Sequence, residues 1–516
     1  MVLVGWDTDR IKNYVFATAK LKEIRGASSI LDELNDDVIR DVVGRDRVIY
    51  AAGGSALAEI EDVSEAQHLI GEVERLYRRR TKSAEITGDW VEMADANTSF
   101  GEYARRLNFK IRLRKDEKLR RRIWLNSPVV KGCQSCGEHP AALVVEESFI
   151  CVVCNLKRNR SKEIKDGSFG SRLKQLLGHA RAKGQWPGLT IANAPDDFEG
   201  IGEAASPKGY IGFIYCDGNR IGELFSQLDR EPYRKLSNGM GKALREVIFD
   251  AFCHHFPNPD QVFPFEIIFI GGDDLVLVVA ADKAMEIALD LCREFEKRTK
   301  RILEEAGLSA QRENLSLSAA VVLSHQSLPI YHLQAIADDL LKSAKRRSLS
   351  IREKENKEVG CIDFHVVTAS ASELPSLARK AEWVRYKGDA ILSLTERPYT
   401  TDEMEAFISR IRELQAANFP TSKLQMLYES IVDESMTQSQ FTWAFVAGRA
   451  KKSKESAKDQ FSKLMAFFDP KQAEWKWPWR KAEATRLAIS MVDGKKLYAT
   501  PMVDVAELYE FVKLKK

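Results

Sequence analysis

The hydrophobic pattern of the first 60 residues predicts a strand, a helix and two strands joined by a tight turn. Residues 1–10 (MVLVGWDTDR) form an apolar run that ends in Asp7 and Asp9, which is typical of a strand followed by a loop. Residues 11–34 carry the periodicity of an amphipathic helix. Residues 48–60 (VIYAAGGSALAEI) place two glycines between apolar runs, which indicates a hairpin.

The same order of elements returns in the second half of the chain. Residues 209–225 (GYIGFIYCDGNRIGELF) predict a strand that ends at Asp217 and a helix, and residues 263–281 predict a second strand–turn–strand unit. The pattern continues as a helix over 282–305, a strand over 315–324, a helix over 331–347 and a strand over 361–367. We interpret the repeat as an internal duplication. From about residue 400 onward helical periodicity dominates, so we expect a helical domain.

The composition is that of a globular protein with several domains. Of the 516 residues 44% are hydrophobic and 30% are charged, and the length suggests about three or four domains. The net charge is only +3, so any contact with nucleic acid must come from local patches. We find no apolar run long enough for a membrane span and no signal-peptide pattern, and we expect a cytoplasmic protein without a membrane partner.

Four of the eight cysteines form a pattern typical of a zinc ribbon. Cys133, Cys136, Cys151 and Cys154 make two C-x2-C pairs separated by fourteen residues. Four thiolates at this spacing hold Zn²⁺ tetrahedrally in closed, structural sites, so we assign no catalysis to them. The alternative is four unrelated thiols.

The stretch FIGGDDLVLVV (residues 269–279) is the main candidate for chemistry. Glycine supplies the positive φ of a two-residue hairpin turn, which places Asp273 and Asp274 at the tip or just inside the second strand. If the strand that ends at Asp217 is a neighbour in the sheet, three carboxylates converge, and such groups are tolerated around a divalent cation. This is the usual metal site for phosphoryl transfer. The alternative is an ordinary acidic turn.

Two further features suit a triphosphate. Gly218 follows Asp217, and a helix is predicted to begin at Arg220, whose backbone N–H groups can bind phosphate. Lys342 and Lys345 have i, i+3 spacing on a predicted helix, so they share a face from which they can reach phosphates. The alternative is a solvated helix face.

Several stretches together resemble the large, polymerase-like subunit of type III CRISPR effector complexes, the Cmr/Csm large subunit of the Cas-ten family. They are KLKEIRGASSILDELN (20–35), GGDDLVLVV (271–279), SLPIYHLQAIADDLLKSAKRRS (327–348) and CIDFHVV (361–367). The resemblance extends from residue 1 to about 395. It implies an α+β fold with two ferredoxin-like palm domains, an intervening four-cysteine zinc ribbon and a C-terminal helical domain. The implied boundaries are 1–125, 126–208, 209–399 and 400–516.

The resemblance also implies an activity. ATP is joined 3′ to 5′ and cyclised into oligoadenylates, which serve as second messengers for nucleases. Synthesis is triggered by target RNA within a complex that contains guide RNA and other effector subunits.

By position, the resemblance gives Asp217, Asp273 and Asp274 the role of catalytic ligands for Mg²⁺ or Mn²⁺. The expected ATP contacts are Gly218, Asn219, Gly271, Gly272, Lys342 and Lys345, with Ser316 and Ser318 as candidates for reading adenine. In the first palm the hairpin reads Gly53-Gly54-Ser55-Ala56 and lacks the acids, so it is expected to bind nucleotide without catalysing.

Two departures from the family change the expectations. Relatives often carry a second acid where this chain has Asn219, and an amide is a weaker Mg²⁺ ligand. The chain starts directly at the first palm and contains no His-Asp dipeptide, the mark of the family's N-terminal nuclease domain. We therefore expect no cleavage of single-stranded DNA by this polypeptide.

Two alternatives to an RNA-triggered synthase stay open. One is a scaffold for the guide-RNA complex with a silent palm, and the other is a stand-alone nucleotide cyclase that needs no guide RNA. The basic runs at 110–122 and 157–163 favour membership of an RNA complex, although such runs are usually solvated faces.

Overall fold

The computed structural model describes the chain except for residues 96, 120–129, 169–171, 368–382, 388–389, 452–454, 468–477, 483–494 and 515–516. The end of the first basic run, residues 120–122, therefore lies outside the described residues. None of the described helices is both long and apolar enough to cross a bilayer.

The first sheet has four antiparallel strands in the order β2-β3-β1-β4. The strands are β1 (Val2–Asp9), β2 (Val48–Ala52), β3 (Ser55–Ile60) and β4 (Glu85–Glu92). The helices around it are α1 (Ile11–Val15), α2 (Leu21–Glu33), a π-helix (Leu34–Val38), α3 (Ile39–Val43), α4 (Val63–Thr81) and α5 (Phe100–Leu119). Because successive strand residues face opposite sides, Leu3 joins the core cluster of α5 and Val4 that of α4. Both faces are thus covered, which explains the continuous apolar run.

The second sheet has six strands in the order β14-β11-β10-β7-β9-β8. The strands are β7 (Tyr210–Gly218), β8 (Phe265–Gly271), β9 (Asp274–Ala280), β10 (Leu317–His325), β11 (Cys361–Val367) and β14 (Tyr399–Thr400). Its helices are α9 (Ile221–Phe225), α10 (Arg230–His255), α11 (Ala281–Glu305) and α12 (Ile330–Glu355). The predicted strands and helices of this region are confirmed, and α12 continues beyond its predicted end.

The two sheets repeat one topology. The order β4-β1-β3-β2 of the first corresponds to β10-β7-β9-β8 of the second, with the first strand of each unit between the third and the fourth. Shortly after that first strand each unit has an arginine in the left-handed region, Arg10 at φ 51° and Arg220 at φ 55°. An unusual backbone conformation at matching positions supports the predicted internal duplication.

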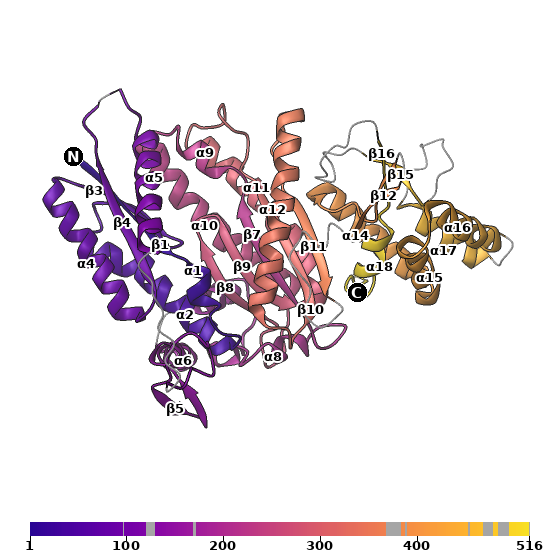
Figure 1. The fold of residues 1–516 in the computed structure, drawn as a ribbon, viewed down its shortest axis with the longest axis horizontal. Helices are drawn as coiled ribbons and strands as arrows, with labels where there is room; N and C mark the ends of the chain where they lie inside the picture. Colours follow the sequence, from indigo (N-terminus) through magenta and orange to yellow (C-terminus); the bar gives the residue numbers. More distant parts are fainter. Residues whose placement is uncertain are drawn as a thin grey trace.

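The units pack directly against each other. Helix α2 of the first unit lies along β8, the edge strand of the second, where the Ser28 hydroxyl donates to the Ile268 carbonyl and Arg25 pairs with Glu266. Lys12 of α1 also pairs with Asp338 of α12 at 2.5 Å. The two sheets lie next to each other in the left and centre of Figure 1.

A segment of small elements connects the two units. It contains β5 (Leu143–Val145), β6 (Ser148–Ile150), α6 (Val152–Lys165), α7 (Arg172–Ala182), a 3₁₀ turn (Ile191–Asn193) and α8 (Glu199–Gly202). The β5–β6 hairpin with α6 lies below the first unit in Figure 1, and α6 packs against α2.

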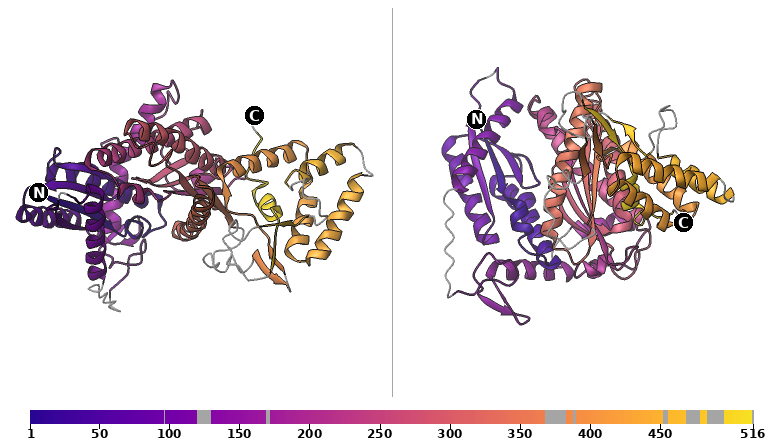
Figure 2. Two further views of the ribbon diagram at one scale, coloured as in Figure 1. Left: turned by 90° about the horizontal axis from the view of Figure 1, so that it is seen from above. Right: turned by 45° about the vertical axis from the view of Figure 1, so that its right-hand side comes forward.

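The C-terminal region lies at the opposite end of the molecule from the first sheet (Figures 1 and 2). Its helices are α14 (Thr401–Ala416), α15 (Thr421–Val432), α16 (Met436–Lys451), α17 (Glu455–Met465) and α18 (Met502–Leu508). It also contains a four-stranded sheet, which the prediction of a helical tail missed: β12 (Val384–Lys387), β13 (Ala390–Ser393), β16 (Lys496–Ala499) and β15 (Arg480–Lys481). The strands are four residues or shorter, and β12 and β13 lie far in sequence from β15 and β16, so no local periodicity marks the sheet.

Candidate active site and zinc site

The β8–β9 hairpin brings the three predicted acids together. Gly272 takes a positive φ of 60°, Asp273 completes the turn, and Asp274 is the first residue of β9. Strand β7 pairs with β9 so that Cys216 lies opposite Leu275. One step further along this register, Asp217 meets Asp274. The predicted convergence of carboxylates from two neighbouring strands therefore exists in the fold.

The electrostatics of this cluster are those of crowded carboxylates. Burial, followed by the charge of Asp217, raises the pKa of Asp273 to about 6. Burial and the charges of Asp217 and Asp273 raise the pKa of Asp274 well above its usual value. The Asp274 Oδ1 atom is enclosed and has no hydrogen-bond partner among the described residues. An enclosed, unpartnered carboxylate oxygen beside two other carboxylates fits a divalent cation, since Mg²⁺ and Mn²⁺ prefer oxygen ligands.

The acids are not already neutralised by basic side chains at the turn. Within the described part of the chain, no Lys or Arg nitrogen forms a salt bridge with Asp273 or Asp274, whereas Lys345 pairs with Asp217. The three carboxylates are not among the described groups whose ligand atoms all lie within 4.8 Å of one another. Their mutual repulsion and the Lys345 contact explain this spacing.

Two glycines allow the hairpin to sit where it does. A Cβ on Gly218 would lie 2.5 Å from Asp273 Oδ2, so only glycine lets this carboxylate approach β7. A Cβ on Gly271 would lie 2.1 Å from the Cα of Gly53. The glycine turns of the two units therefore touch, and the degenerate hairpin of the first unit supports the acid-bearing hairpin of the second.

Replacing Gly271 with Ala should push the two turns apart. We expect an overpacking cost of about 1–3 kcal/mol and a loss of ATP turnover, because Asp273 and Asp274 follow directly on the displaced strand end. Thermal unfolding and the rate of ATP consumption measure the two effects. The matched control is Gly222→Ala, where a Cβ would meet nothing within 4 Å. Equal behaviour of the two variants would contradict the contact.

The two predicted phosphate-binding lysines have different surroundings in the structure. Lys345 reaches Asp217, and its side chain is 33% exposed. Lys342 is 71% exposed and pairs with Asp339 on its own helix at 3.3 Å. Only Lys345 therefore lies at the acid cluster in this conformation.

We expect Lys345→Ala to lower ATP turnover by at least about tenfold, while Lys342→Ala changes it less than threefold. Lys345 is the positive charge next to Asp217, whereas Lys342 makes an exposed pair of small energetic value. Steady-state kinetics with ATP as the varied substrate separate effects on kcat from effects on KM. Equal losses in both variants would contradict this division.

The predicted adenine contacts, Ser316 and Ser318, lie in the interior. Both are fully buried and hydrogen-bonded to Asn219: the Asn219 amide donates to Ser316 Oγ, and Ser318 Oγ donates to Asn219 Oδ1, both at 2.9 Å. Asn219 is itself 3% exposed, and its backbone N–H donates to the Ser316 carbonyl at 2.9 Å. These bonds hold the end of β7 against the start of β10. A contact with ATP stays a prediction for all three residues.

The predicted helix after Asp217 is short. Helix α9 has five residues and begins at Ile221, and Arg220 before it pairs with Glu223 at 2.6 Å. A single turn is a weaker phosphate site than the full helix that the sequence suggested.

A cavity of about 1010 Å³ opens beside Asp273 between the two units. The hairpin of the first unit contributes Tyr50 and Ser55, and α9 and α10 of the second contribute Phe225 and Tyr233. Tyr50 and Tyr233 stack with their ring centroids 6.0 Å apart. The wall from α5 carries Arg105, Arg106, Asn108, Phe109, Lys110 and Arg112. Aromatic and basic side chains next to the acids suit a nucleotide base and its phosphates. No sequence pattern marks this cavity, because it forms only where the two units meet.

The first unit retains acids at the end of its first strand but not at its hairpin. Asp7 pairs with Lys115 of α5 at 2.7 Å, and Asp9 lies 3.4 Å from Lys115 and 3.6 Å from Lys118. Lysines thus compensate these carboxylates internally. That this unit binds nucleotide without catalysing stays a prediction.

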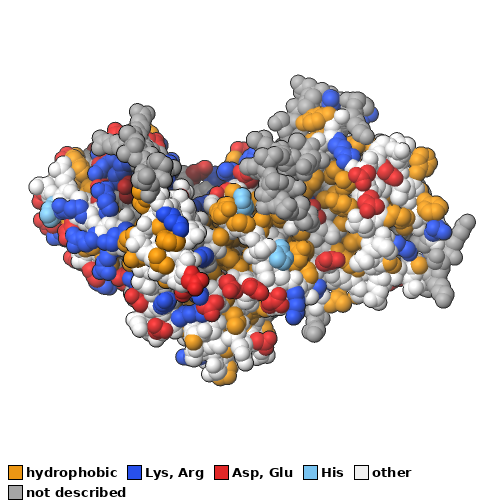
Figure 3. Space-filling model, turned by 60° about the horizontal axis from the view of Figure 1, so that its bottom comes forward, with side chains coloured by type: hydrophobic (Ala, Val, Ile, Leu, Met, Phe, Trp, Pro, Cys, Tyr) orange, Lys and Arg blue, Asp and Glu red, His pale blue; other side chains and the backbone are white. Residues whose placement is uncertain are grey.

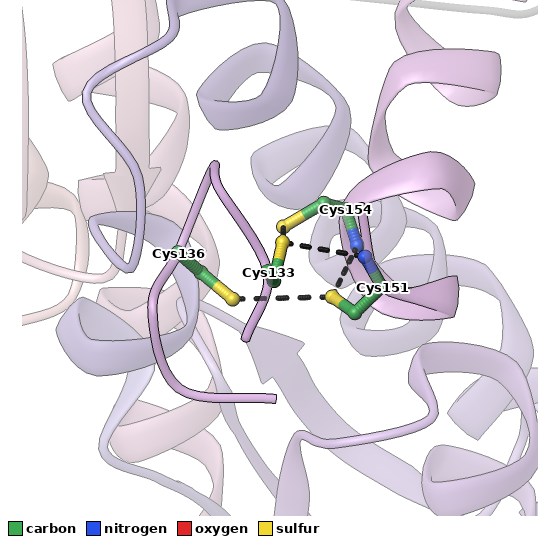
Figure 4. Close-up of side chains that lie close together, drawn as sticks. All are labelled: Cys133, Cys136, Cys151 and Cys154. Carbon is green, nitrogen blue, oxygen red and sulfur yellow. Dashed lines mark hydrogen bonds between the residues drawn. The ribbon is translucent and has the colours of Figure 1, made fainter. Parts of the chain in front are cut away.

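The four cysteines form a tight cluster (Figure 4). Their sulfurs all lie within 4.8 Å of one another, with Cys133 3.8 Å from Cys154 and Cys136 3.9 Å from Cys151. The Cys133 sulfur accepts from the N–H groups of Ser135 and Cys151, and the Cys151 sulfur accepts from the N–H of Cys154. Backbone N–H groups aimed at sulfur stabilise thiolates, so the residues fit a structural Zn²⁺.

The two basic runs are largely engaged within the fold. Lys110, Arg114, Lys115 and Lys118 of α5 all pair with acids of the first unit. Lys157 is 1% exposed and donates to the Tyr14 carbonyl, and Arg158 pairs with the buried Glu23 at 2.7 Å. The described parts of these runs therefore offer less free charge to RNA than the sequence suggested.

Comparison with known proteins agrees with the fold. Residues 210–354 match the family described as Cas10/Cmr2, second palm domain. The curated CRISPR system single-strand-specific deoxyribonuclease Cas10/Csm1 (subtype III-A) of Enterococcus italicus is 20% identical over 514 residues, which cover 86% of this chain and 64% of that protein. The chain therefore spans 64% of that relative's length.

Solved structures with similar folds are Csm1 proteins. Csm1 in T. onnurineus superposes with a TM-score of 0.56 at 16% identity, covering 99% of this chain and 70% of that one. The Csm1–Csm4 cassette in complex with pppApA superposes with a TM-score of 0.54 at 15% identity, covering 100% of this chain and 69% of that one. The cassette in complex with cA4 superposes with a TM-score of 0.51 at 15% identity, covering 99% of this chain and 70% of that one. At these identities the structures establish the fold.

The fold and the acid-bearing hairpin define the class: the second unit is a palm domain of the Cas10/Cmr2 type. With the domain match, the curated relative and the Csm1 fold together, the chain is a relative of the large subunits of type III CRISPR systems.

Proposed function

We propose that the chain is the large subunit of a type III CRISPR effector and synthesises cyclic oligoadenylates from ATP by 3′–5′ nucleotidyl transfer. The observation that carries the proposal is the convergence of Asp217, Asp273 and Asp274 within the segment that matches the Cas10/Cmr2 palm. In the reaction a ribose 3′-oxygen attacks the α-phosphorus of ATP, and the bond to pyrophosphate breaks. In the last step the 3′-oxygen of the oligoadenylate attacks the α-phosphorus at its own 5′ end, which releases pyrophosphate and closes the ring.

The acids are the proposed ligands of Mg²⁺ or Mn²⁺. When bound, such ions make the attacking hydroxyl more acidic and neutralise the charge of the leaving pyrophosphate. Asp274 offers its enclosed Oδ1, and Asp273 faces the cavity between the palms. Lys345, which lies beside Asp217, would supply positive charge for a phosphate. Gly272 leaves room for the substrate, because a Cβ there would meet nothing within 4 Å, whereas the space at Gly218 is taken by Asp273.

The cavity between the palms is the proposed place of the second nucleotide. Tyr50 and Tyr233 supply aromatic surface for a base, and Arg112 of the α5 wall, which forms no salt bridge within the described residues, supplies positive charge for phosphates. The similar Csm1–Csm4 structures in complex with pppApA and cA4 support a ligand of this class for the fold.

The proposed setting is a cytoplasmic ribonucleoprotein with guide RNA, target RNA and other effector subunits. Because related structures are Csm1–Csm4 cassettes, we propose a neighbouring subunit of the Csm4 kind for this chain as well. The four-cysteine cluster serves as a structural zinc site in this assembly.

Incubation of the purified chain, alone and in its complex, with ATP, Mg²⁺ or Mn²⁺ and target RNA tests the proposal. RNA-dependent cyclic product, separated by chromatography and identified by mass, is the expected result. Product without RNA favours the stand-alone cyclase. No product with either metal, with or without the complex, overturns the synthase and leaves the scaffold.

A further inference from the structure

A row of basic side chains runs along the exposed face of α4 in the first palm. Arg75, Arg78 and Arg79 are exposed and follow the i, i+3, i+4 spacing of a single helix face, and the exposed Lys82 caps the helix in the left-handed conformation at φ 66°. We call these four residues the α4 strip. Figure 3 shows Lys and Arg side chains gathered at the end of the molecule that the first palm occupies, on the left.

The α4 strip differs from the basic runs that stand out in the sequence. The lysines of α5 and the basic residues at the start of α6 are bound to acids and carbonyls of the fold. Within the described residues, by contrast, no side chain of the α4 strip forms a salt bridge, and the nearby Arg80 reaches only Glu33 at 3.8 Å. The charge of the strip is therefore available to a partner.

Helix stability does not account for the strip. Cations in the last turn of a helix interact favourably with its dipole, which explains Arg78, Arg79 and Arg80 in part. The effect falls off within that turn, yet Arg75 lies before it. The inner face of α4 packs through the buried side chains of Leu69, Ile70, Val73 and Tyr77. The basic residues on the outer face are therefore not needed to pack the helix.

We propose that the α4 strip binds the phosphate backbone of single-stranded RNA. Four cations along roughly 10 Å of helix match a short run of phosphates on an extended strand. The aromatic residue of this region, Tyr77, is buried, so the strip offers charge without a stacking platform, and the contact is independent of sequence. The choice of RNA over an acidic protein surface rests on the proposed function, which places RNA beside this subunit.

The test compares two triple variants of the full chain that each remove three positive charges. One is Arg75→Gln/Arg78→Gln/Arg79→Gln, and the matched control is Arg234→Gln/Lys242→Gln/Lys297→Gln on exposed positions of the second palm. Binding of labelled single-stranded RNA and DNA of equal sequence is measured by fluorescence anisotropy over a range of salt. Circular dichroism confirms that both variants are folded.

In the strip variant we expect the Kd for RNA to rise about tenfold or more and the slope of log K against log salt to fall by roughly 2, at about 0.7 for each lost phosphate contact. The control should change neither by a similar amount. Similar binding of DNA supports a backbone contact, whereas binding of DNA alone, or equal losses in both variants, overturns the proposal. Synthesis of cyclic product by the unmodified chain is scored separately, so failure of the strip and failure of the synthase are distinguishable.

Discussion

Replacing Asp274 with Asn should abolish ATP-dependent synthesis and raise the melting temperature of the protein in magnesium-free buffer. Activity is expected to fall at least about 100-fold, more than the loss of a supporting residue causes, because Asp274 is a proposed metal ligand. Stability should increase because the variant removes a carboxylate that burial and two neighbouring carboxylates make costly to ionise. Each 1 kcal/mol relieved should raise Tm by roughly 2–4 °C in a domain of this size.

The same gain in stability, in the neighbouring variant Asp273→Asn, is expected to depend on pH. The pKa of Asp273 is raised to about 6, so its protonated form stabilises the fold at low pH, and that contribution is lost as the pH rises through 6. The gain in Tm of Asp273→Asn over the unmodified chain should therefore be small near pH 4 and full above pH 6. Zinc content should stay unchanged, since Cys133 and its three partners belong to a separate site.

The control for both variants is Asp116→Asn, at an exposed position of α5. It should change neither Tm nor activity. An Asp274→Asn variant that loses activity and is also less stable than the unmodified chain would show that Asp274 supports the fold, and the proposal of a metal site would then fail.

The parts of the fold that the sequence predicted well are those with local signals. Apolar runs that end in Asp7 or Asp217 and glycine pairs between such runs depend on neighbours in the chain, and the strands and hairpins lie where these signals placed them. The cluster of Cys133, Cys136, Cys151 and Cys154 was predictable for the same reason, because its spacing alone encodes the geometry.

The parts that the sequence did not predict depend on tertiary contacts. Ser316 and Ser318 were candidates from the predicted strand over 315–324, but whether their hydroxyls are free depends on Asn219, to which both are hydrogen-bonded. Lys115 likewise forms a salt bridge with Asp7, which lies more than a hundred residues away in the sequence. The contact between Gly53 and Gly271 exists only because two units of similar shape meet, and no pattern within either unit reveals it.

The second large effect is expected from loss of the zinc site. Cys151 and Cys154 lie at the start of α6, which packs against α2 so closely that a Cβ on Gly26 would lie 1.8 Å from the Lys157 carbonyl oxygen. Between these helices the fully buried Glu23 accepts hydrogen bonds from Ser135, in the cysteine loop, and from Arg158. Loss of zinc releases both donors, and a buried charge without partners costs about 3–5 kcal/mol.

Helix α2 links this effect to the acid-bearing hairpin. The hydroxyl of Ser28 holds the carbonyl of Ile268 in β8, and β8 ends at Gly271, directly before the acids. We therefore expect Cys154→Ser to lose one zinc per chain, to lower Tm by roughly 10 °C and to reduce ATP turnover at temperatures where the chain is still folded. Metal analysis, thermal unfolding and the turnover assay measure the three quantities.

Two further variants separate zinc binding from the helix contact. Cys253→Ser removes a buried cysteine outside the cluster and should retain zinc and activity. Glu23→Gln should keep zinc but lose part of the stability and of the turnover, since an amide cannot replace the charge-assisted bonds to Arg158 and Ser135. If the zinc-free Cys154→Ser chain unfolded at the same temperature and turned over ATP at the same rate as the unmodified chain, α2 could not be the link between the cysteine cluster and the catalytic hairpin.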